Sequence, residues 1–205
     1  PETPVLDRAA TTFIKPVIDR LASVLTRLGL SADLMTLLGF AIGMGAAVLI
    51  ATQQFLAGAI AILLSRLCDG LDGAIARRTQ TTDAGGFLDI ALDFVFYASI
   101  PLAFALADPQ RNALAAALLL ATFCGTMSSF LAFAVIAAKR KMTNLSWPDK
   151  SLYFLGGLTE ASETLFCFVA MCLWPQHFPL LAGIFAAMCA ITTVTRIWWG
   201  WRAFS

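Results

Sequence analysis

Four aspartates form two closely spaced pairs in the first half of the sequence. Asp69 and Asp72 lie three residues apart, and Asp89 and Asp93 lie four apart. Residues three or four apart share one face of a helix, so two neighbouring helices can bring the four carboxylates together. Ligand sets made only of oxygen favour hard ions such as Mg²⁺ or Mn²⁺. Four carboxylates can hold two ions, and such a paired site grips phosphate oxygens during a displacement reaction.

Small residues and one arginine accompany these aspartates. Gly73 and Ala76 follow the first pair, and Gly85 precedes the second. A helix surface with almost no side chain lets a bulky ligand approach the backbone. The planar guanidinium of Arg77 would bind phosphate oxygens through two parallel hydrogen bonds. These features predict a substrate that carries a diphosphate, and phosphoryl chemistry driven by positioning and charge neutralisation.

The helices that carry these residues belong to a strongly apolar chain. Of its 205 residues, 59% are hydrophobic and 13% are charged, whereas about 25% are charged in a typical soluble domain. The composition predicts an all-α integral membrane protein. Each ionisable residue inside a membrane costs roughly 2.5–3.5 kcal/mol on insertion scales, so a cluster of four indicates a functional site.

We expect one domain over residues 1–205, with six transmembrane helices preceded by an N-terminal amphipathic interfacial helix. The amphipathic helix falls within residues 1–30, from about Val5 to Leu28, and Gly29 ends it. The six-helix bundle occupies residues 33–201. Its spans are predicted at about 33–52, 55–80, 84–107, 112–138, 157–174 and 179–201.

The distribution of Lys and Arg predicts the orientation in the membrane. These residues cluster before the first predicted span, after the second, between the fourth and fifth, and at the C-terminus. With six spans, all of these ends lie on one face, which the positive-inside rule assigns to the cytoplasm. The sequence therefore predicts that both termini and the aspartates face the cytoplasm. We expect the inner or plasma membrane of a bacterium.

The aspartate region resembles the signature of the CDP-alcohol phosphatidyltransferase family. Every signature position is filled, in the order Asp69-x2-Asp72-Gly73-x2-Ala76-Arg77-x7-Gly85-x3-Asp89-x3-Asp93. The predicted interfacial helix and six spans are similar to that family as well. One departure is Ala32-Asp33, where many relatives have a Pro-Asn pair before the first span. Asp33 can still cap the helix, so this departure concerns a nucleotide contact and leaves the fold unaffected.

The resemblance implies a role for each position of the signature. All four aspartates would ligate two Mg²⁺ or Mn²⁺ ions, and Asp93 would also act as general base on the acceptor hydroxyl. The nucleotide-binding residues would be Asp72, Gly73, Ala76, Arg77 and Gly85. The reaction would transfer a phosphatidyl group from CDP-diacylglycerol to an alcohol and release CMP. Family members are typically homodimers, and no nucleic-acid partner is expected.

The signature leaves the acceptor alcohol open. Arg196 lies before the end of the last predicted span, where it would bind an anionic acceptor such as glycerol 3-phosphate or an inositol phosphate. Glu160 and Glu163 indicate instead a polar or cationic acceptor pocket. Both glutamates also fit a simpler interpretation, because carboxylates interact favourably with the N-terminal end of a helix.

Other functions remain open for an intramembrane aspartate cluster. A membrane prenyltransferase also uses paired aspartates and Mg²⁺ on a lipid diphosphate, but its second cluster comes much later in the chain. A divalent-cation transporter needs carboxylates but has no need of Gly73, Ala76 and Arg77 beside them. A purely structural alternative pairs the aspartates with Arg66, Arg77 and Arg78, although three cations cannot neutralise four anions.

Overall fold

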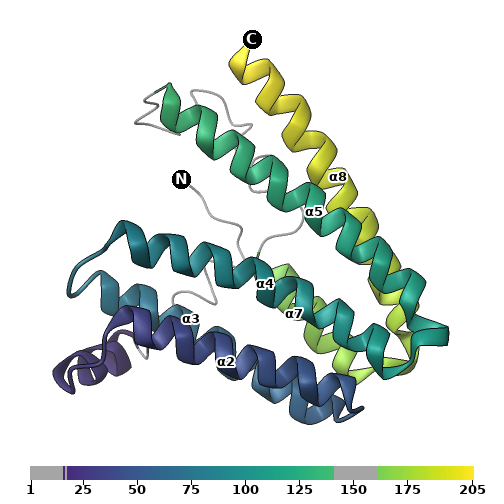
Figure 1. Cartoon of the computed structure of the whole chain (residues 1–205), viewed down its shortest axis with the longest axis horizontal. Coiled ribbons are helices and arrows are strands. Elements are labelled where there is room, and N and C mark those ends of the chain that lie inside the picture. The colour runs from purple at the N-terminus through teal and green to yellow at the C-terminus, as the bar shows by residue number, and fades with distance from the viewer. Residues whose placement is uncertain (1–15, 17, 141–160) are drawn as a thin grey trace. The chain divides into compact units, whose positions relative to one another are not determined.

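The computed structural model describes residue 16, residues 18–140 and residues 161–205. These residues fall into two compact units, one ending at Ile100 and the other beginning at Pro101. Every regular element in the described residues is a helix, and they contain no strand (Figure 1). The predicted all-α class is therefore confirmed.

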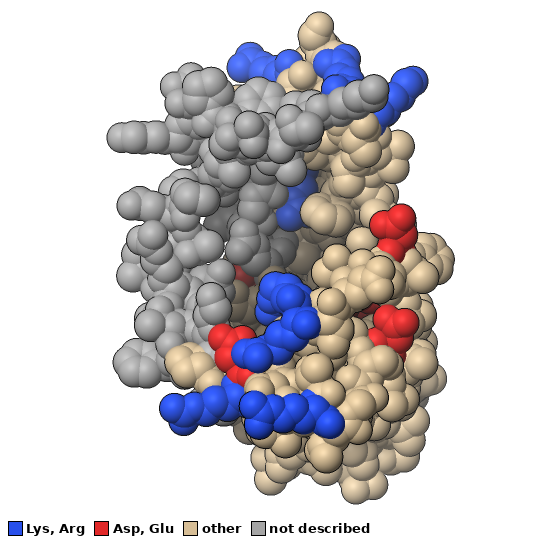
Figure 2. Space-filling view, turned by 90° about the vertical axis from the view of Figure 1, so that its left-hand side faces the viewer, with Lys and Arg blue, Asp and Glu red and all other residues tan. Residues whose placement is uncertain are grey.

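Four stretches of the described residues are long and apolar enough to cross a membrane. They are α2 (Ala32–Ala51), α4 (Asp83–Ala107), α5 (Pro109–Lys139), and the run of η2 (Pro175–His177) with α8 (Phe178–Phe204). Among the described residues visible in Figure 2, those without charge cover more of the surface than Lys, Arg, Asp and Glu, as contact with lipid requires. The composition and these helices are those of an integral membrane protein.

Two further helices are less apolar or shorter. α3 (Phe55–Ala76) has 22 residues, enough to cross the hydrocarbon core at 1.5 Å per residue. Every 18-residue stretch of α3 nevertheless contains Arg66, Asp69 and Asp72, so the candidate site itself lowers the apolar character of this helix. α7 (Ala161–Leu173) has 13 residues and begins where the described residues resume. The count of six spans stays a prediction.

Part of the predicted N-terminal helix lies outside the described residues, while residues 18–27 are helical. Ala22 is fully buried in a cluster with Leu71 and Ile75 of α3. The helix ends at Gly29, as predicted, because Gly29 has φ +80° and the N–H of Leu30 donates to the carbonyl of Leu25 at 3.1 Å. The first unit thus begins with a helix fixed against the end of α3 that carries the aspartates.

Glycines let α2 approach its neighbours closely in the first unit. A Cβ added to Gly39 would lie 2.9 Å from Cβ of Cys68 on α3, and one added to Gly43 would lie 2.6 Å from Cδ2 of Phe96 on α4. Ser65 uses the short distance to donate a 2.7 Å hydrogen bond to the carbonyl of Gly39. The four-residue spacing of these glycines is typical of closely packed membrane helices.

Polar residues set the ends of the helices around the site. The hydroxyl of Ser31 accepts from the N–H of Leu34 at 3.2 Å and caps α2. α3 ends at Ala76, four residues before its predicted end, because the N–H of Arg78 turns to the carbonyl of Ile75 at 2.9 Å. The hydroxyl of Thr82 then accepts from the N–H of Gly85 at 3.0 Å and starts α4.

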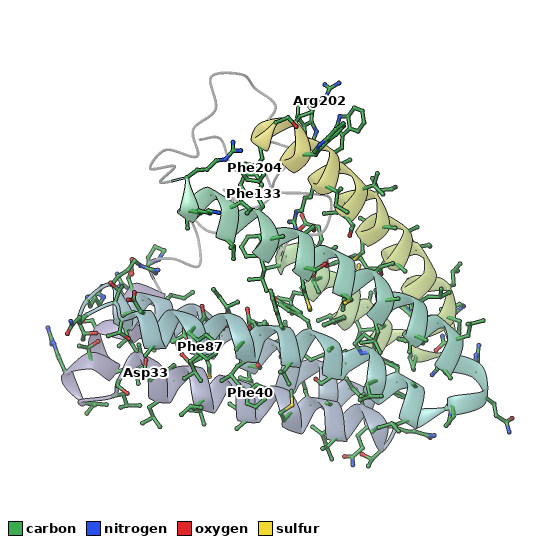
Figure 3. All side chains as sticks on the ribbon, turned by 45° about the horizontal axis from the view of Figure 1, so that its top comes forward. Asp33, Phe40, Phe87, Phe133, Arg202 and Phe204 are labelled. Carbon is green, nitrogen blue, oxygen red and sulfur yellow. The ribbon has the colours of Figure 1, made fainter. Side chains whose placement is uncertain are left out.

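The second unit is organised around the pair α5 and α8. Phe133 of α5 and Phe204 of α8 have ring centroids 5.0 Å apart, and Figure 3 shows both side chains between the two helices. Phe123 of α5 lies in edge contact with Phe168 of α7 and Phe185 of α8. The aromatic contacts therefore join all three helices in one core.

We predict that Gly43→Ala destabilises the first unit. The added methyl would overlap the ring of Phe96 and the hydroxyl of Ser65, so we expect a loss of about 1–3 kcal/mol in the free energy of unfolding. Thermal unfolding in detergent measures the effect. Gly45→Ala is the matched control, because a Cβ at Gly45 meets no atom within 4 Å. Equal melting temperatures for the two variants would contradict the close packing of Gly43.

Candidate functional site

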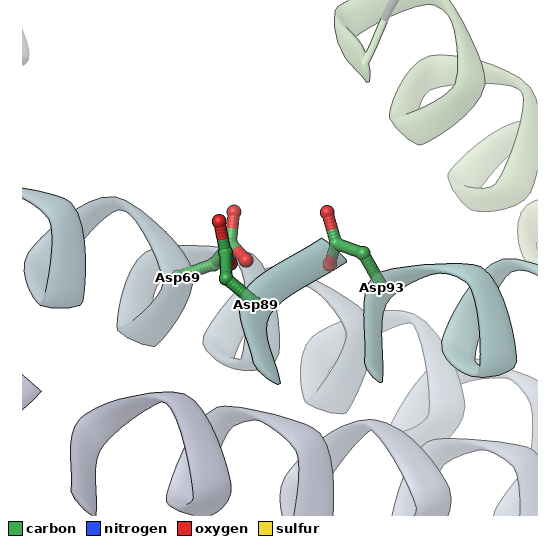
Figure 4. A group of neighbouring side chains, drawn as sticks. All are labelled: Asp69, Asp89 and Asp93. Atoms are coloured by element: carbon green, nitrogen blue, oxygen red, sulfur yellow. The ribbon is translucent and has the colours of Figure 1, made fainter. Parts of the chain in front are cut away.

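Three of the four predicted aspartates meet between α3 and α4. Asp69 comes from α3, and Asp89 and Asp93 come from consecutive turns of α4 (Figure 4). One carboxylate oxygen from each of the three lies within 4.8 Å of the others. The spacings of three and four residues therefore place the carboxylates on facing helix surfaces, as the sequence predicts.

A small cavity of about 10 Å³ lies at this group of aspartates. That volume is near the roughly 10–15 Å³ that one water molecule needs. Its wall includes Arg66 together with Asp69, Asp89 and Asp93. The cavity therefore has the size of a single water molecule or ion, and the charged residues of its lining are three aspartates and one arginine.

The donor set fits a hard divalent cation. Two oxygens on opposite sides of Mg²⁺, each at about 2.1 Å, lie about 4.2 Å apart, and the 4.8 Å limit of this group is close to that separation. All of the donors are carboxylate oxygens, which Mg²⁺ and Mn²⁺ accept and soft metals disfavour. The aspartate group could therefore bind a metal ion.

Asp72 lies outside this group of three and contacts α2 instead. Its Oδ2 accepts a 2.6 Å hydrogen bond from Oγ1 of Thr36, and the residue is 5% exposed. The same Oγ1 also lies 3.1 Å from the carbonyl oxygen of Ala32. A buried carboxylate needs such a donor. Without one, the free-energy cost of removing its charge from water is not offset by any hydrogen bond.

Arg66 provides the positive charge nearest to the three aspartates. Its Nη1 donates to Oδ1 of Asp93 at 2.6 Å and lies 3.4 Å from Oδ1 of Asp69. The guanidinium carbon lies 4.2 Å from the ring centroid of Phe96, within the range of a cation–π contact. The purely structural alternative pairs the four aspartates with three arginines. Of these pairs, the structure contains those of Arg66 with Asp69 and Asp93.

The other two arginines of that alternative contact different partners. Arg78 lies 3.8 Å from Oδ1 of Asp19 in the N-terminal helix, across an exposed ion pair. Arg77 is exposed, and its Nη1 lies 3.3 Å from the position that a Cβ on Gly73 would take. Its guanidinium therefore folds back over the bare helix surface at Gly73.

A larger open groove of about 150 Å³ adjoins the aspartates. Gly73, Ala76 and Gly85, which the sequence predicts to leave room for a ligand, all line it. A Cβ at Gly85 would lie 2.9 Å from Oδ1 of Asp33, so Gly85 lets the start of α2 approach α4. Figure 3 shows Asp33 at that end of α2.

The groove and the small cavity share part of their walls. Thr36 and Asp89 line both. Asp72 belongs to the groove, and Asp69 and Asp93 belong to the cavity. The arrangement places a carboxylate-lined position for an ion beside a groove that is large enough to accept part of a larger ligand.

The candidate acceptor residues belong to the second unit or lie outside the described residues. Nη1 of Arg196 on α8 donates to the carbonyl of Thr126 on α5 at 3.3 Å, and its guanidinium carbon lies 5.9 Å from the ring centroid of Phe130. Glu163 lies in the first turn of α7, where the helix dipole favours it. Glu160 falls outside the described residues.

Sequence analysis missed two residues of the site. Thr36 bonds to Asp72 across 36 residues, and its position four residues after Ala32 carries no signal of that contact. The sequence indicates Arg66 only as a structural cation, although its position three residues before Asp69 places both on one helix face. Its contact with Asp93 depends on the register between α3 and α4, which the sequence leaves undetermined.

Comparison with known proteins gives both a family match and close relatives. The family described as CDP-alcohol phosphatidyltransferase matches residues 29–199. The inner membrane protein YnjF of Escherichia coli is 52% identical over 197 residues, which cover 96% of each chain. A protein of Mycobacterium marinum named phosphatidylinositol phosphate synthase is 30% identical over 98% of this chain and 86% of its own length.

The fold is also similar to a solved structure. The phosphatidylinositol phosphate synthase of Mycobacterium tuberculosis, crystallised with CDP-DAG bound, gives a TM-score of 0.67 at 24% identity, over 91% of this chain and 94% of the other. A second crystal structure of that protein, in complex with manganese and citrate, gives the same TM-score. The similarity shows a common fold.

We predict that Thr36→Val destabilises the chain by about 1–3 kcal/mol, because it removes the hydroxyl that donates to buried Asp72 and keeps the side-chain shape. Thermal unfolding in detergent measures the change. Thr52→Val is the control, since that exposed hydroxyl bonds to the carbonyls of Val48 and Leu49 in its own helix. A Thr36→Val variant as stable as the control would show that the bond to Asp72 contributes nothing.

Proposed function

The chain belongs to the CDP-alcohol phosphatidyltransferase family, and we propose that it transfers a phosphatidyl group from CDP-diacylglycerol to the hydroxyl of an alcohol and releases CMP. One observation carries the proposal. The group of Asp69, Asp89 and Asp93 lies beside a groove lined by the small residues of the family signature. An ion position next to room for a nucleotide is what a diphosphate substrate requires.

The aspartates would hold the metal. We propose that Asp69, Asp72, Asp89 and Asp93 together bind two Mg²⁺ or Mn²⁺ ions, for which Asp72 would turn from Thr36 toward the other three. The manganese complex of the mycobacterial synthase supports this choice of metal. When bound, the ions would neutralise charge on the diphosphate and make CMP a better leaving group.

The groove would take the nucleotide. Gly73, Ala76 and Gly85 would leave room for it, and Asp72 would line its wall. Arg77 folds over Gly73 at the edge of this groove, from where a rotation of its exposed side chain would bring the guanidinium to the phosphates. The CDP-DAG complex of the mycobacterial synthase supports a nucleotide lipid as substrate.

Asp93 would act as the general base. An alcohol is a poor nucleophile until its proton is removed, and a carboxylate within hydrogen-bond reach can accept that proton. Arg66 holds Oδ1 of Asp93 at 2.6 Å. That contact involves Oδ1, and Oδ2 would receive the proton of the acceptor hydroxyl.

The acceptor would be an anionic alcohol. Arg196 would bind its phosphate, as Arg side chains bind such groups elsewhere. The names of the mycobacterial relatives favour an inositol phosphate over glycerol 3-phosphate. Glu160 and Glu163 would instead suit a polar or cationic acceptor, which the alcohol panel below tests as well.

The membrane arrangement completes the proposal. We propose six spans in one domain, an N-terminal helix in the membrane interface, and an active site and both termini on the cytoplasmic side of a bacterial inner membrane. The helix at residues 18–27 and the turn that follows it present Val24 and Leu28 as exposed apolar side chains, which suit contact with lipid. We further propose that the protein functions as a homodimer.

The decisive experiment measures CMP release. Purified protein receives CDP-diacylglycerol, Mg²⁺ or Mn²⁺, and a panel of alcohols that includes inositol phosphate and glycerol 3-phosphate. We expect CMP with one acceptor and loss of activity on addition of a chelator. Absence of CMP with every acceptor, or full activity with the chelator present, would overturn the proposal. A prenyl diphosphate donor and a metal-uptake assay in vesicles test the two alternative functions.

Asp93→Asn tests the general base. We expect at least about a hundredfold loss of turnover, because the amide cannot accept the proton, while the Kd for the CDP lipid changes little. Asp83→Asn, at the exposed start of α4, is the control for a neutralised carboxylate on the same helix. Retained turnover in Asp93→Asn would remove this residue from the base role.

Ala76→Leu tests the nucleotide groove. The larger side chain would fill space in the groove, so we expect the Kd for a cytidine nucleotide to rise about tenfold or more. Ala57→Leu makes the same change at an exposed position near the opposite end of α3. If the two variants bind the nucleotide equally well, the groove at Ala76 is not the nucleotide site.

A further inference from the structure

Arg66 contacts the same carboxylates that a metal ion in this cavity would bind. Its Nη1 lies 2.6 Å from Oδ1 of Asp93 and 3.4 Å from Oδ1 of Asp69. Both carboxylates belong to the group that could bind a metal, and Arg66 lines the small cavity with them. The same oxygens cannot receive the full interaction of both a guanidinium and a divalent cation.

Packing brings the guanidinium to this position. Phe96 supports it from one side, with the ring centroid 4.2 Å from the guanidinium carbon. The ring of Phe96 in turn lies flush against Gly43 of α2. The Arg66 side chain is 13% exposed, so water screens its charge much less than that of the exposed Arg77 and Arg78.

The hydrogen bonding of Arg66 is incomplete. Its buried Nε has no hydrogen-bond partner among the described residues, and its contact with Oγ of Ser65 is long, at 3.4 Å. A buried arginine with a purely structural role is expected to have its donors satisfied. The strongest attachment of this guanidinium is instead to the aspartate that lines the cavity.

We propose that Arg66 is a built-in cation of the aspartate cluster, which competes with a divalent ion for Asp69 and Asp93 and thereby weakens ion binding there. This inference rests on the proposed function, in which the aspartates hold Mg²⁺ or Mn²⁺. Arg66 neutralises part of the cluster while no ion is bound. A divalent ion must then overcome the repulsion of the guanidinium and take its place on Asp93.

A titration with Mn²⁺ tests the inference without measuring activity. Free Mn²⁺ is followed by electron paramagnetic resonance with the full chain in detergent. Arg66→Leu and Arg66→Gln both remove the charge, and Gln keeps a hydrogen-bond donor for Asp93. We expect both variants to bind Mn²⁺ at least about tenfold more tightly than the unaltered chain. Thermal unfolding shows whether each variant is folded, and Arg66→Gln carries the test if the Leu variant is not.

Two variants serve as controls. One keeps a positive charge at position 66, and the other removes a positive charge at a different position. Arg66→Lys retains a cation, so we expect an Mn²⁺ affinity within about threefold of the unaltered chain. Arg78→Leu removes a cation of the same type just beyond α3, where it pairs with Asp19, and should also change the affinity by less than about threefold.

The outcomes separate the inference from the proposed function. Equal or weaker Mn²⁺ binding by the neutral Arg66 variants, with clear binding by the unaltered chain, overturns the inference and leaves the metal site in place. Binding by the neutral variants but not by the unaltered chain supports it. Absence of binding in every variant overturns both the metal site and the inference drawn from it.

Discussion

Carboxylates inside an apolar helix bundle must be neutralised, and the first unit is arranged to do so. Three of the four aspartates have a compensating contact. Thr36 donates to Asp72, and Arg66 contacts both Asp69 and Asp93. These contacts leave the cluster with more negative than positive charge, because one arginine faces several carboxylates. A divalent cation would complete the balance, and this is the basis on which we propose a metal-dependent enzyme of phosphate chemistry.

Close helix packing makes these contacts possible. α2 lies near enough to α3 for Ser65 to bond to the backbone of Gly39 and for Thr36 to reach Asp72. At the level of Gly43, the ring of Phe96 fills the space that a side chain would take and supports Arg66. Small residues in this unit therefore have two uses. Gly39 and Gly43 bring helices together, whereas Gly73 and Ala76 leave a groove open beside the aspartates.

The sequence predicts the helices well where apolar runs and helix signals agree, and less well at polar ends. α2 was expected at 33–52 and is found at Ala32–Ala51. α5 begins at Pro109 instead of near residue 112, because Asp108 caps it and Pro109 occupies its first position. The aspartate spacing predicted three members of the cluster correctly. The bonds from Thr36 and Arg66 depend on the register between helices, which hydropathy and spacing do not determine.

The shared wall of the cavity and the groove has a thermodynamic consequence. Thr36 and Asp89 line both spaces, so a ligand in one space alters the charges and donors that face the other. Linkage then requires reciprocity, and whatever factor an occupant of the groove applies to ion affinity, the ion applies to that occupant. The two ligands of this site would thus change each other's affinity by the same factor.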